Sequence, residues 1–584
     1  MRRTFHHSPW FWLGLALLVV LVRGLFIEVM DVDAAQYASI AMEMGQRGTW
    51  LQVLHRGSDY LDKPPLLFWT SAASMRLFGR YSWAYKLPSL LGALAGVYAI
   101  YRFSKLFYTE QTARHAALIL ASGFGLIVIC NDVRTDTLLL GMTACAVWQL
   151  AEYVQVSRMK NLMLAATFVG LAMLAKGPIG LVMPAFAVGT HLLLRRDWRH
   201  LFHWPWLAAL GVVALVLAPM GWGLYQQFDL HPEKVVNGRN GVSGLWFFFW
   251  EQSFGRITGG NVWKNDTSAL YFLHVYLWAF LPWPLLLLAG LWQRIQTMIR
   301  QKFLLPTHEE AYSLGGFLFT FVALSCSQYK LPHYIFVTLP WASVLVARWL
   351  NQPHSNLSPS FSLPITGEIK GAGRWGRGGS TQRYWAVGQY LVLTVLGVAS
   401  VAMAGFVFPT WNPFVWGPIM AVFGWLIFCI IRNPFPEDFA NVLVQRSVLA
   451  LLGAAFALNF HFYPHLLPFQ SSSAAAHWAR QNGVPTASLA AYHRHGHALD
   501  FYSGQILPFL DTPEEVKKWT AASGPLWVYT DKYGYKQLRR AGLPCSPVAS
   551  FFHFQVTLLR VAFLDPATRP LALEPIFLLK ILPE

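Results

Sequence analysis

Carboxylates, a lysine and tyrosines crowd into the polar stretch at residues 28–86, which separates the first two long apolar runs. Asp31 and Asp33 follow the first run, and Tyr60-Leu61-Asp62-Lys63-Pro64-Pro65 lies before the second. Cations and hydroxyl groups bind phosphate, whereas a carboxylate can take a proton from an attacking hydroxyl. This combination beside a membrane predicts chemistry on a charged lipid head group.

Similar side chains recur where polar residues interrupt the apolar runs at three other places, which we assign to the same face of the membrane. They are, in chain order, Asp132, Arg134 and Asp136, then Lys176, then Lys330 and Tyr334. Charges beside hydrocarbon are costly unless they pair or face a cavity, so their gathering on one face indicates a site. Each alone has a structural explanation, in which Asp33 caps a helix, Lys63 snorkels and Arg134 pairs with a carboxylate.

Composition places these residues in a membrane protein that crosses the bilayer many times. Of the 584 residues, 55% are hydrophobic and 12% are charged. Apolar runs that suit a hydrocarbon core of about 30 Å predict about thirteen transmembrane helices. Their approximate bounds are 9–27, 87–104, 114–130, 137–155, 162–175, 178–194, 204–223, 269–292, 311–326, 332–349, 385–407, 414–431 and 447–464.

The distribution of basic residues orients these spans. Alternate short connections are rich in Arg and Lys, which places them on the cytosolic side and explains much of the net charge of +17 without nucleic-acid binding. The loops 28–86 and 224–268 then face outward, as does everything after residue 464. We therefore expect a transmembrane catalytic domain over 1–464 and an outer domain over 465–584.

Two short helices are expected inside the first outer loop. Residues 33–47 and 64–78 carry apolar side chains at helical spacing, which suits helices lying in the interface. Asp33 falls at the start of the first helix. Pro64-Pro65 forces Lys63 out of helical geometry just before the second.

The outer domain after residue 464 reads as a small α/β unit. Strands are expected at 526–530 and 551–559, and a helix begins at Thr512-Pro513-Glu514-Glu515, where proline and two acids suit a first turn. His493-Arg494-His495-Gly496-His497 has no accompanying cysteine and no nearby acidic ligand beyond Asp500, so it is interpreted as a solvated loop.

Four segments together resemble a known enzyme family. They are Asp33-x-x-Gln36-Tyr37, Tyr60-Leu61-Asp62-Lys63-Pro64-Pro65, Arg134-Thr135-Asp136 and Lys330-Leu331-Pro332-x-Tyr334. In this order they resemble GT-C polyprenyl-phosphate-sugar glycosyltransferases, particularly the bacterial lipid A aminoarabinose transferases and the protein O-mannosyltransferases. The resemblance covers most of residues 1–350. It implies a polytopic α-helical membrane protein with the GT-C fold and a small C-terminal α/β domain outside the membrane.

The resemblance also implies roles for individual residues. Asp33 matches the catalytic acid that activates the acceptor hydroxyl, and Asp136 matches a second acidic position. Matches to the donor-phosphate site are Lys63, Tyr60, Lys176, Arg256 and Tyr334. Supporting positions are Asp62, Tyr37, Arg134 and Lys330.

Three positions depart from the family pattern. Ser253 stands where some aminoarabinose transferases have histidine, Asp62 replaces a glutamate before the lysine, and Gln36 replaces an arginine. The resemblance therefore names no certain cofactor and no metal ligands, although a divalent metal stays open.

The resemblance implies transfer of a sugar from a polyprenyl-phosphate carrier to a hydroxyl or phosphate acceptor. The acceptor could be a lipid A-like lipid, a protein or a surface glycan. The expected location is the bacterial inner membrane, among membrane lipids, with the site facing the periplasm. Alternatives are a lipid or polysaccharide transporter, and a ligase that moves a whole glycan from polyprenyl diphosphate.

Overall fold

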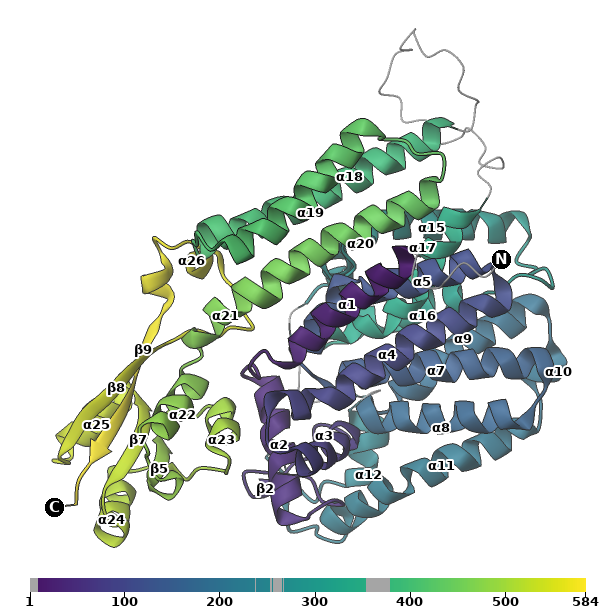
Figure 1. Ribbon diagram of the computed structural model, residues 1–584. Helices are drawn as coiled ribbons and strands as arrows, with labels where there is room; N and C mark the ends of the chain where they lie inside the picture. Colours follow the sequence, from purple (N-terminus) through teal and green to yellow (C-terminus); the bar gives the residue numbers. More distant parts are fainter. Residues whose placement is uncertain are drawn as a thin grey trace.

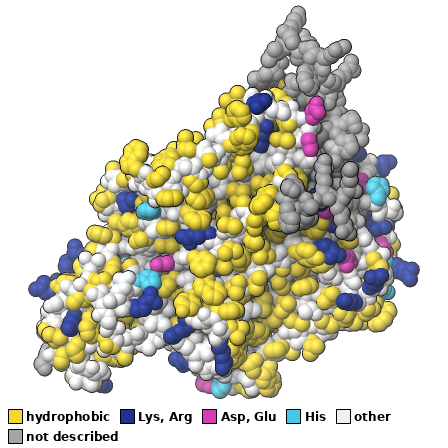
Figure 2. Space-filling model, in the orientation of Figure 1, with side chains coloured by type: hydrophobic (Ala, Val, Ile, Leu, Met, Phe, Trp, Pro, Cys, Tyr) yellow, Lys and Arg dark blue, Asp and Glu magenta, His cyan; other side chains and the backbone are white. Residues whose placement is uncertain are grey.

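The computed structural model describes residues 9–236, 238–252, 255, 265, 267–352 and 379–583. Long helices pack side by side in one body, and a sheet with its own helices lies at one end of them (Figure 1). Hydrophobic side chains cover much of the face that the long helices form (Figure 2). Several are largely exposed, such as Leu215 at 73% and Phe414 at 83%, and a lipid environment would cover this surface.

The helices of the first 300 residues surround most of the predicted site residues. They are α1 (Pro9–Leu25), α2 (Asp33–Arg47), α3 (Leu66–Phe78), α4 (Ser82–Phe107), α5 (Glu110–Ala121), α6 (Phe124–Asn131), α7 (Thr135–Val156), α8 (Met159–Lys176), α9 (Ile179–Arg195), α10 (Trp198–Leu201), α11 (Pro205–Leu224), α12 (Gly244–Trp246), α14 (Tyr271–Ala279) and α15 (Pro284–Arg300). Two hairpins lie between them, β1 (Leu54–His55) with β2 (Ser58–Asp59) and β3 (Val235–Val236) with β4 (Arg239–Asn240).

The helices that follow continue the body and lead to the sheet. They are α16 (Tyr312–Ser325), the 3-10 helix η4 (Pro332–Thr338), α17 (Leu339–Asn351), α18 (Gly379–Ala402), α19 (Pro413–Arg432), α20 (Phe439–Ala457), η7 (Leu458–Phe462), α21 (Tyr463–Leu466) and η8 (Leu467–Phe469).

Seven helical segments of the described chain are long and apolar enough to cross a membrane, or up to nine if each of two bent pairs is one span. Three shorter apolar helices are α1, α9 and α16. A protein of many spans is confirmed, but the predicted count of about thirteen is not. One reason is that α14 and α15, predicted as the single span 269–292, meet at an angle of 120°.

The two short helices expected in the first outer loop are present. The prediction for 33–47 is confirmed by α2. Helix α3 begins at Leu66 rather than at residue 64. The reason is that Pro64 and Pro65 each disfavour helical geometry in the residue before them.

Close contacts hold α4 against α7 and against the end of α6. A Cβ on Gly141 would meet the carbonyl oxygen of Gly92 at 2.0 Å, so glycine is required for this approach. Buried Lys86 in α4 donates to the carbonyl oxygens of Ile27 at 2.8 Å and Asn131 at 2.7 Å. Lys86 thereby satisfies one carbonyl group just after α1 and another at the end of α6, next to the acidic segments of the predicted site.

The C-terminal part holds a five-stranded sheet of order β6-β5-β7-β9-β8. Its elements are α22 (Ser471–Gln481), β5 (Leu489–Tyr492), α23 (His497–Ser503), β6 (Phe509–Leu510), α24 (Pro513–Ser523), β7 (Leu526–Asp531), α25 (Lys532–Arg540), β8 (Cys545–His553), α26 (Val561–Leu564) and β9 (Glu574–Ile581). Strands β6, β5 and β7 are parallel, whereas β9 is antiparallel to β7 and β8.

Alternating side chains give this sheet two buried faces. Leu489 and Ala491 pack on one side with residues of α22, and Ala490 and Tyr492 pack on the other with Val516 of α24. The predicted strand at 526–530 and the helix start at Thr512 are confirmed.

The predicted strand at 551–559 is mostly wrong, because β8 ends at His553. Beyond that residue the chain leaves the sheet. The amide of Phe554 donates to the carbonyl oxygen of Phe469 at 2.9 Å, and its ring stacks on Phe563.

Candidate active site

Asp33 is the first residue of α2, where a negative charge is favoured by the helix dipole. The N-cap is Val32, and no side chain caps the helix there. The Asp33 carboxylate, 35% exposed, instead accepts a hydrogen bond from Arg134. The capping explanation for Asp33 is therefore wrong, and this carboxylate belongs to an ion pair between distant parts of the chain.

Arg134 lies in the turn between α6 and α7 and serves two carboxylates. Its Nε and Nη2 atoms donate to Asp132 Oδ2 at 3.1 and 2.9 Å, while Nη1 donates to Asp33. Burial lowers the pKa of Arg134, but the two carboxylates raise it more, so the pKa stays above its ordinary value. The guanidinium is a permanent cation that holds the start of α2 against the turn.

A second ion pair joins Asp136, in the first turn of α7, to Lys176, the last residue of α8. Gly177 ends α8 with φ 83°, a left-handed value that glycine adopts without strain. The Asp136 side chain is 2% exposed, and its Oδ2 atom accepts no hydrogen bond from the described residues. Buried carboxylate oxygens are normally hydrogen-bonded, so Oδ2 has capacity for a further donor.

Helix η4 brings His333 and Tyr334 against both ion pairs. The Tyr334 ring centre lies 3.9 Å from Lys176 Nζ, close enough for a cation–π contact. His333 Nδ1 lies 3.3 Å from Arg134 Nη1, and its Nε2 lies 3.7 Å from Asp136 Oδ2. The predicted site set omitted this histidine, although its place between Lys330 and Tyr334 could have indicated it.

Two tyrosines of the outer loop lie close to this cluster. The rings of Tyr37 and Tyr60 both pack edge-to-face with Phe68, and their centres lie 5.9 and 6.1 Å from the centre of the Phe68 ring. Burial raises the pKa of both hydroxyls, and the charge of Asp33 adds to this effect in each. The two phenols are therefore protonated at neutral pH and able to donate hydrogen bonds.

Asp62 and Lys63 follow Tyr60 on the approach to α3. The charge of Asp62 also raises the pKa of Tyr60, which places this carboxylate beside the phenol. Lys63 lines a narrow cavity together with Tyr60, Met220 and Phe248. The structure thus brings the Tyr60–Lys63 segment against Met220 of α11 and against Phe248.

Lys330, another predicted site residue, makes its contacts away from the two ion pairs. Lys330 donates from Nζ to the carbonyl oxygen of Thr267 at 3.1 Å, and its backbone forms hydrogen bonds with the Asn265 side chain, so in the structure it holds Asn265 and Thr267. Arg256 lies outside the described residues, as does Ser253.

The C-terminal part clamps the segment that leads to Asp33. Asp31 accepts hydrogen bonds from the Ser472 hydroxyl and from the Ala498 amide at 2.9 Å. Gln470 accepts from the Asp31 amide at 2.8 Å and donates to the Val29 carbonyl oxygen at 3.0 Å. Burial raises the pKa of Asp31, although the hydrogen bonds from Ser472 and Ala498 to its carboxylate oppose the shift.

The histidine run at 493–497 packs against the outer loop, so its interpretation as a solvated loop is wrong beyond exposed His493. His497 Nδ1 lies 3.3 Å from His55 Nε2, and His495 Nε2 lies 3.1 Å from Asp500 Oδ2. Buried Asp500 also pairs with Arg56. Burial lowers the pKa of His55 to about 4 and that of His497 to about 3, with neighbouring cations adding to the shift.

A metal would need several close donors. Within the described ranges, no group of three or more His, Cys, Asp or Glu side chains is placed to hold a metal ion. We therefore derive no chemistry through a metal.

Comparison with known proteins gives this geometry a context. Residues 62–222 match the dolichyl-phosphate-mannose-protein mannosyltransferase family. Undecaprenyl phosphate-alpha-4-amino-4-deoxy-L-arabinose arabinosyl transferase of Pseudomonas aeruginosa (strain UCBPP-PA14) is 25% identical over 350 residues, 58% of this chain and 58% of the relative. The enzyme of the same name from Edwardsiella ictaluri is 25% identical over 354 residues. The chain thus matches less than two thirds of the length of these relatives.

Solved structures extend the likeness to nearly the whole chain. The crystal structure of ArnT from Cupriavidus metallidurans bound to undecaprenyl phosphate superposes with a TM-score of 0.71 at 18% identity, covering 97% of each chain. The chain has the GT-C fold. It resembles GT-C polyprenyl-phosphate-sugar transferases, as the motif order predicted. The apo form of the same ArnT gives a TM-score of 0.69 with the same coverage.

Proposed function

We propose that this protein is an integral-membrane glycosyltransferase that moves a sugar from a polyprenyl-phosphate carrier to a hydroxyl or phosphate acceptor. The observation that carries the proposal is the pairing of Asp33 with Arg134 beside the Asp136–Lys176 pair. These charges meet at helix ends within a fold shared with ArnT bound to undecaprenyl phosphate.

In this proposal Asp33 is the base. Its carboxylate takes the proton from the acceptor hydroxyl while that oxygen forms a bond to the anomeric carbon of the sugar. The bond from the anomeric carbon to the carrier phosphate breaks, and the polyprenyl phosphate leaves with its electron pair. Arg134 pairs with Asp33 and directs its carboxylate into the cluster between turns of reaction.

The departing phosphate needs cations and hydrogen-bond donors on the other side. Lys176 and Lys63 supply positive charge, while Tyr60 and Tyr334 supply phenolic donors. Asp136 directs Lys176 through the buried pair. We retain Arg256 as a further cation for the sugar or phosphate, because it matches the donor-phosphate site of the family that the motifs resemble.

We propose undecaprenyl phosphate as the carrier, following the names of the relatives. We propose a lipid A-like lipid as the acceptor, following the family that the motifs resemble. A protein or a surface glycan is the alternative acceptor. The site would face the periplasm from the bacterial inner membrane. Residues 1–464 would form the transferase, and residues 465–584 would hold its outer loop in place. None of the relatives named above is a transporter.

Lipid analysis tests the proposal in cells. We expect cells without the protein to accumulate one polyprenyl-phosphate sugar and to lose one modification of lipid or glycan, as measured by mass spectrometry. Asp33→Asn at matched expression should reproduce both changes, whereas Glu514→Gln on exposed α24 should reproduce neither. Unchanged sugar chemistry with an altered distribution of lipid between leaflets would overturn the proposal in favour of a transporter.

A further inference from the structure

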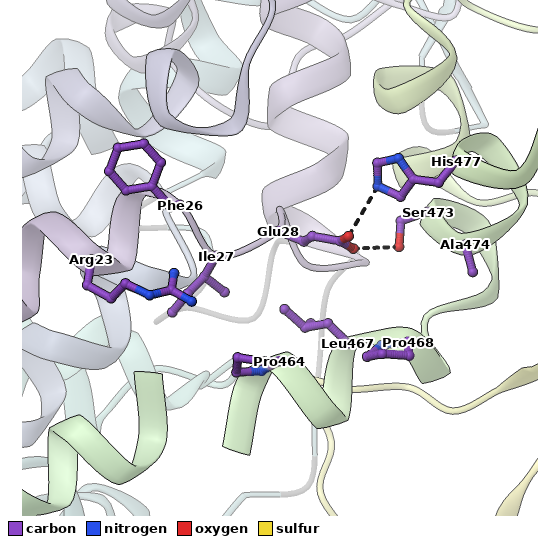
Figure 3. Close-up of a pocket in the computed structure, with 10 residues that line it drawn as sticks. All are labelled: Arg23, Phe26, Ile27, Glu28, Pro464, Leu467, Pro468, Ser473, Ala474 and His477. Atoms are coloured by element: carbon purple, nitrogen blue, oxygen red, sulfur yellow. Dashed lines mark hydrogen bonds and ion pairs between the residues drawn. The ribbon is translucent and has the colours of Figure 1, made fainter. Parts of the chain in front are cut away.

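A cavity of about 340 Å³ lies apart from the ionic cluster, where the end of α1 meets α21, η8 and α22 (Figure 3). Its lining residues are Arg23, Phe26, Ile27, Glu28, Pro464, Leu467, Pro468, Ser473, Ala474 and His477. None of them belongs to the Asp33–Arg134 or Asp136–Lys176 pairs. The cavity therefore has no part in the transfer chemistry proposed above.

The cavity sits at the outer ends of two apolar helices. Helix α1 ends at Leu25, and the apolar segment Phe439–Phe469 ends beside it. The polar sheet region begins immediately afterward with α22. A cavity at this position lies at the boundary between hydrocarbon and water, which is where lipid head groups are found.

One end of the cavity carries a cation. The Arg23 guanidinium lies over the Phe460 ring, 5.2 Å from its centre. Among the described residues no carboxylate lies within 4 Å of it, although Arg134, Arg294 and Arg446 of the same chain all have polar partners. A span-end arginine can simply snorkel to the interface, but Arg23 is half-buried and lines a cavity.

The other end carries a carboxylate. Glu28 accepts hydrogen bonds from Ser473 at 2.9 Å and from His477 at 3.1 Å, which fixes its position on the cavity wall (Figure 3). Two oxygens of an ionised carboxylate can accept about four hydrogen bonds, so Glu28 can receive a further donor. Opposite charges thus line one cavity without pairing to each other.

The wall between the charges is apolar, and it continues onto the outer surface of α1. Ile27, Leu467 and two prolines line the cavity. Val19, Val22 and Phe26 are 53%, 38% and 60% exposed along the helix that leads up to it. An acyl chain lying on this surface would place its head group in the cavity.

We propose that this cavity binds the head group of a zwitterionic phospholipid with a primary ammonium group, such as phosphatidylethanolamine. Arg23 binds the phosphodiester, and Glu28 accepts an N–H from the ammonium. A choline head group has no N–H to donate, and an anionic head group without an amine leaves Glu28 facing negative charge. The bound lipid joins α1 to α22 and ties the sheet region to the membrane surface.

Native mass spectrometry of the full chain in detergent tests the proposal with palmitoyl-oleoyl phosphatidylethanolamine, the matching phosphatidylcholine and phosphatidylglycerol, and diacylglycerol. We expect the ethanolamine lipid to bind about tenfold more tightly than the other two phospholipids, the ratio typical of one charge-assisted hydrogen bond, and diacylglycerol, which loses both interactions, to bind about 100-fold more weakly. Glycerophosphoethanolamine, which lacks acyl chains, should not bind at the same concentration. If it binds as tightly as the lipid, the site takes a soluble phosphate and the proposal is wrong.

Variants separate the two charges. Arg23→Gln should weaken every phospholipid about tenfold and Arg23→Lys should restore most of the binding, while Glu28→Gln should remove only the preference for ethanolamine over choline. Arg432→Gln is the matched control, because Arg432 also ends a span and lies 5.9 Å from the Phe428 ring centre but does not line this cavity. Equal effects of Arg23→Gln and Arg432→Gln, or equal binding of diacylglycerol, would overturn the proposal.

Discussion

Arg134 donates a hydrogen bond from Nη1 to Oδ2 of Asp33, so the proposed base rests in an ion pair with a residue of the turn before α7. The same guanidinium holds Asp132 through two further hydrogen bonds. An acceptor hydroxyl must reach Asp33 beside this cation. The pair makes Arg134 a positioning residue for the proposed base.

Replacement of Arg134 should therefore affect turnover strongly. Arg134→Gln leaves two carboxylates close together without a cation, and we expect kcat/KM to fall by about 100-fold or more. Arg134→Lys keeps the charge but loses the planar fork that serves both acids, so a loss on the order of tenfold is expected. Purified enzyme with a radiolabelled donor measures this. Arg102→Gln, which removes an exposed arginine paired with Glu152, should retain full activity.

A double-mutant cycle separates the structural and chemical roles of the buried Asp136–Lys176 pair. Lys176→Met leaves a buried carboxylate without its cation and should destabilise the protein by about 3–5 kcal/mol. The double variant Asp136→Asn/Lys176→Met should recover much of that stability but not the transfer activity. Thermal unfolding and turnover, measured on the same preparations, test this. Recovery of both properties would assign the pair a purely structural role.

An exposed pair of the sheet region is the control for this cycle. Arg494 pairs with Glu574, whose side chain is 63% exposed. Arg494→Met should cost at most about 1 kcal/mol, because water screens such pairs.

The hydrogen bonds that Gln470 makes to Val29 and Asp31 should help to position Asp33. Gln470→Leu removes both bonds and loosens the segment that leads into α2, so we expect kcat to fall about tenfold while the KM for the donor changes little. Gln481→Leu, on the exposed end of the same region, should leave both constants unchanged. A lower melting temperature with an unchanged kcat would contradict a positioning role for Gln470.

Acid should weaken the contact between the outer loop and the sheet region. His55 and His497, with pKa values of about 4 and about 3, stay neutral in the folded protein below pH 6.5, where the unfolded chain takes up protons. Stability should therefore fall as pH drops from 6.5 toward 4, by on the order of 1–2 kcal/mol per histidine at pH 5.

Melting temperatures between pH 7.5 and pH 5, taken at one scan rate, check this dependence. The double variant His55→Asn/His497→Asn should make the pH profile shallower without removing the slope, because burial lowers the pKa of His553 to about 4 as well. His231→Asn should not, because His231 is an exposed residue of the 224–268 loop paired with Glu233. An equal slope in the wild type and the double variant would show that other groups set the acid response.

The sequence by itself determined the membrane class, the limits of α2 and the start of α24. Each of these depends on neighbours within a few turns, such as apolar spacing or a proline at a first turn. It also marked most of the charged residues that meet at the helix ends, because a charge beside a long apolar run stands out.

Only the tertiary structure decided which of those charges pair. Asp33 and Arg134 are 101 residues apart, Asp136 and Lys176 are 40 apart, and Asp31 and Ser472 are 441 apart. Local periodicity carries no information about such contacts, since they depend on how whole helices pack. The same reason explains why the clamp on Asp31 was not predicted, and why a sharp bend divides the apolar run at 269–292.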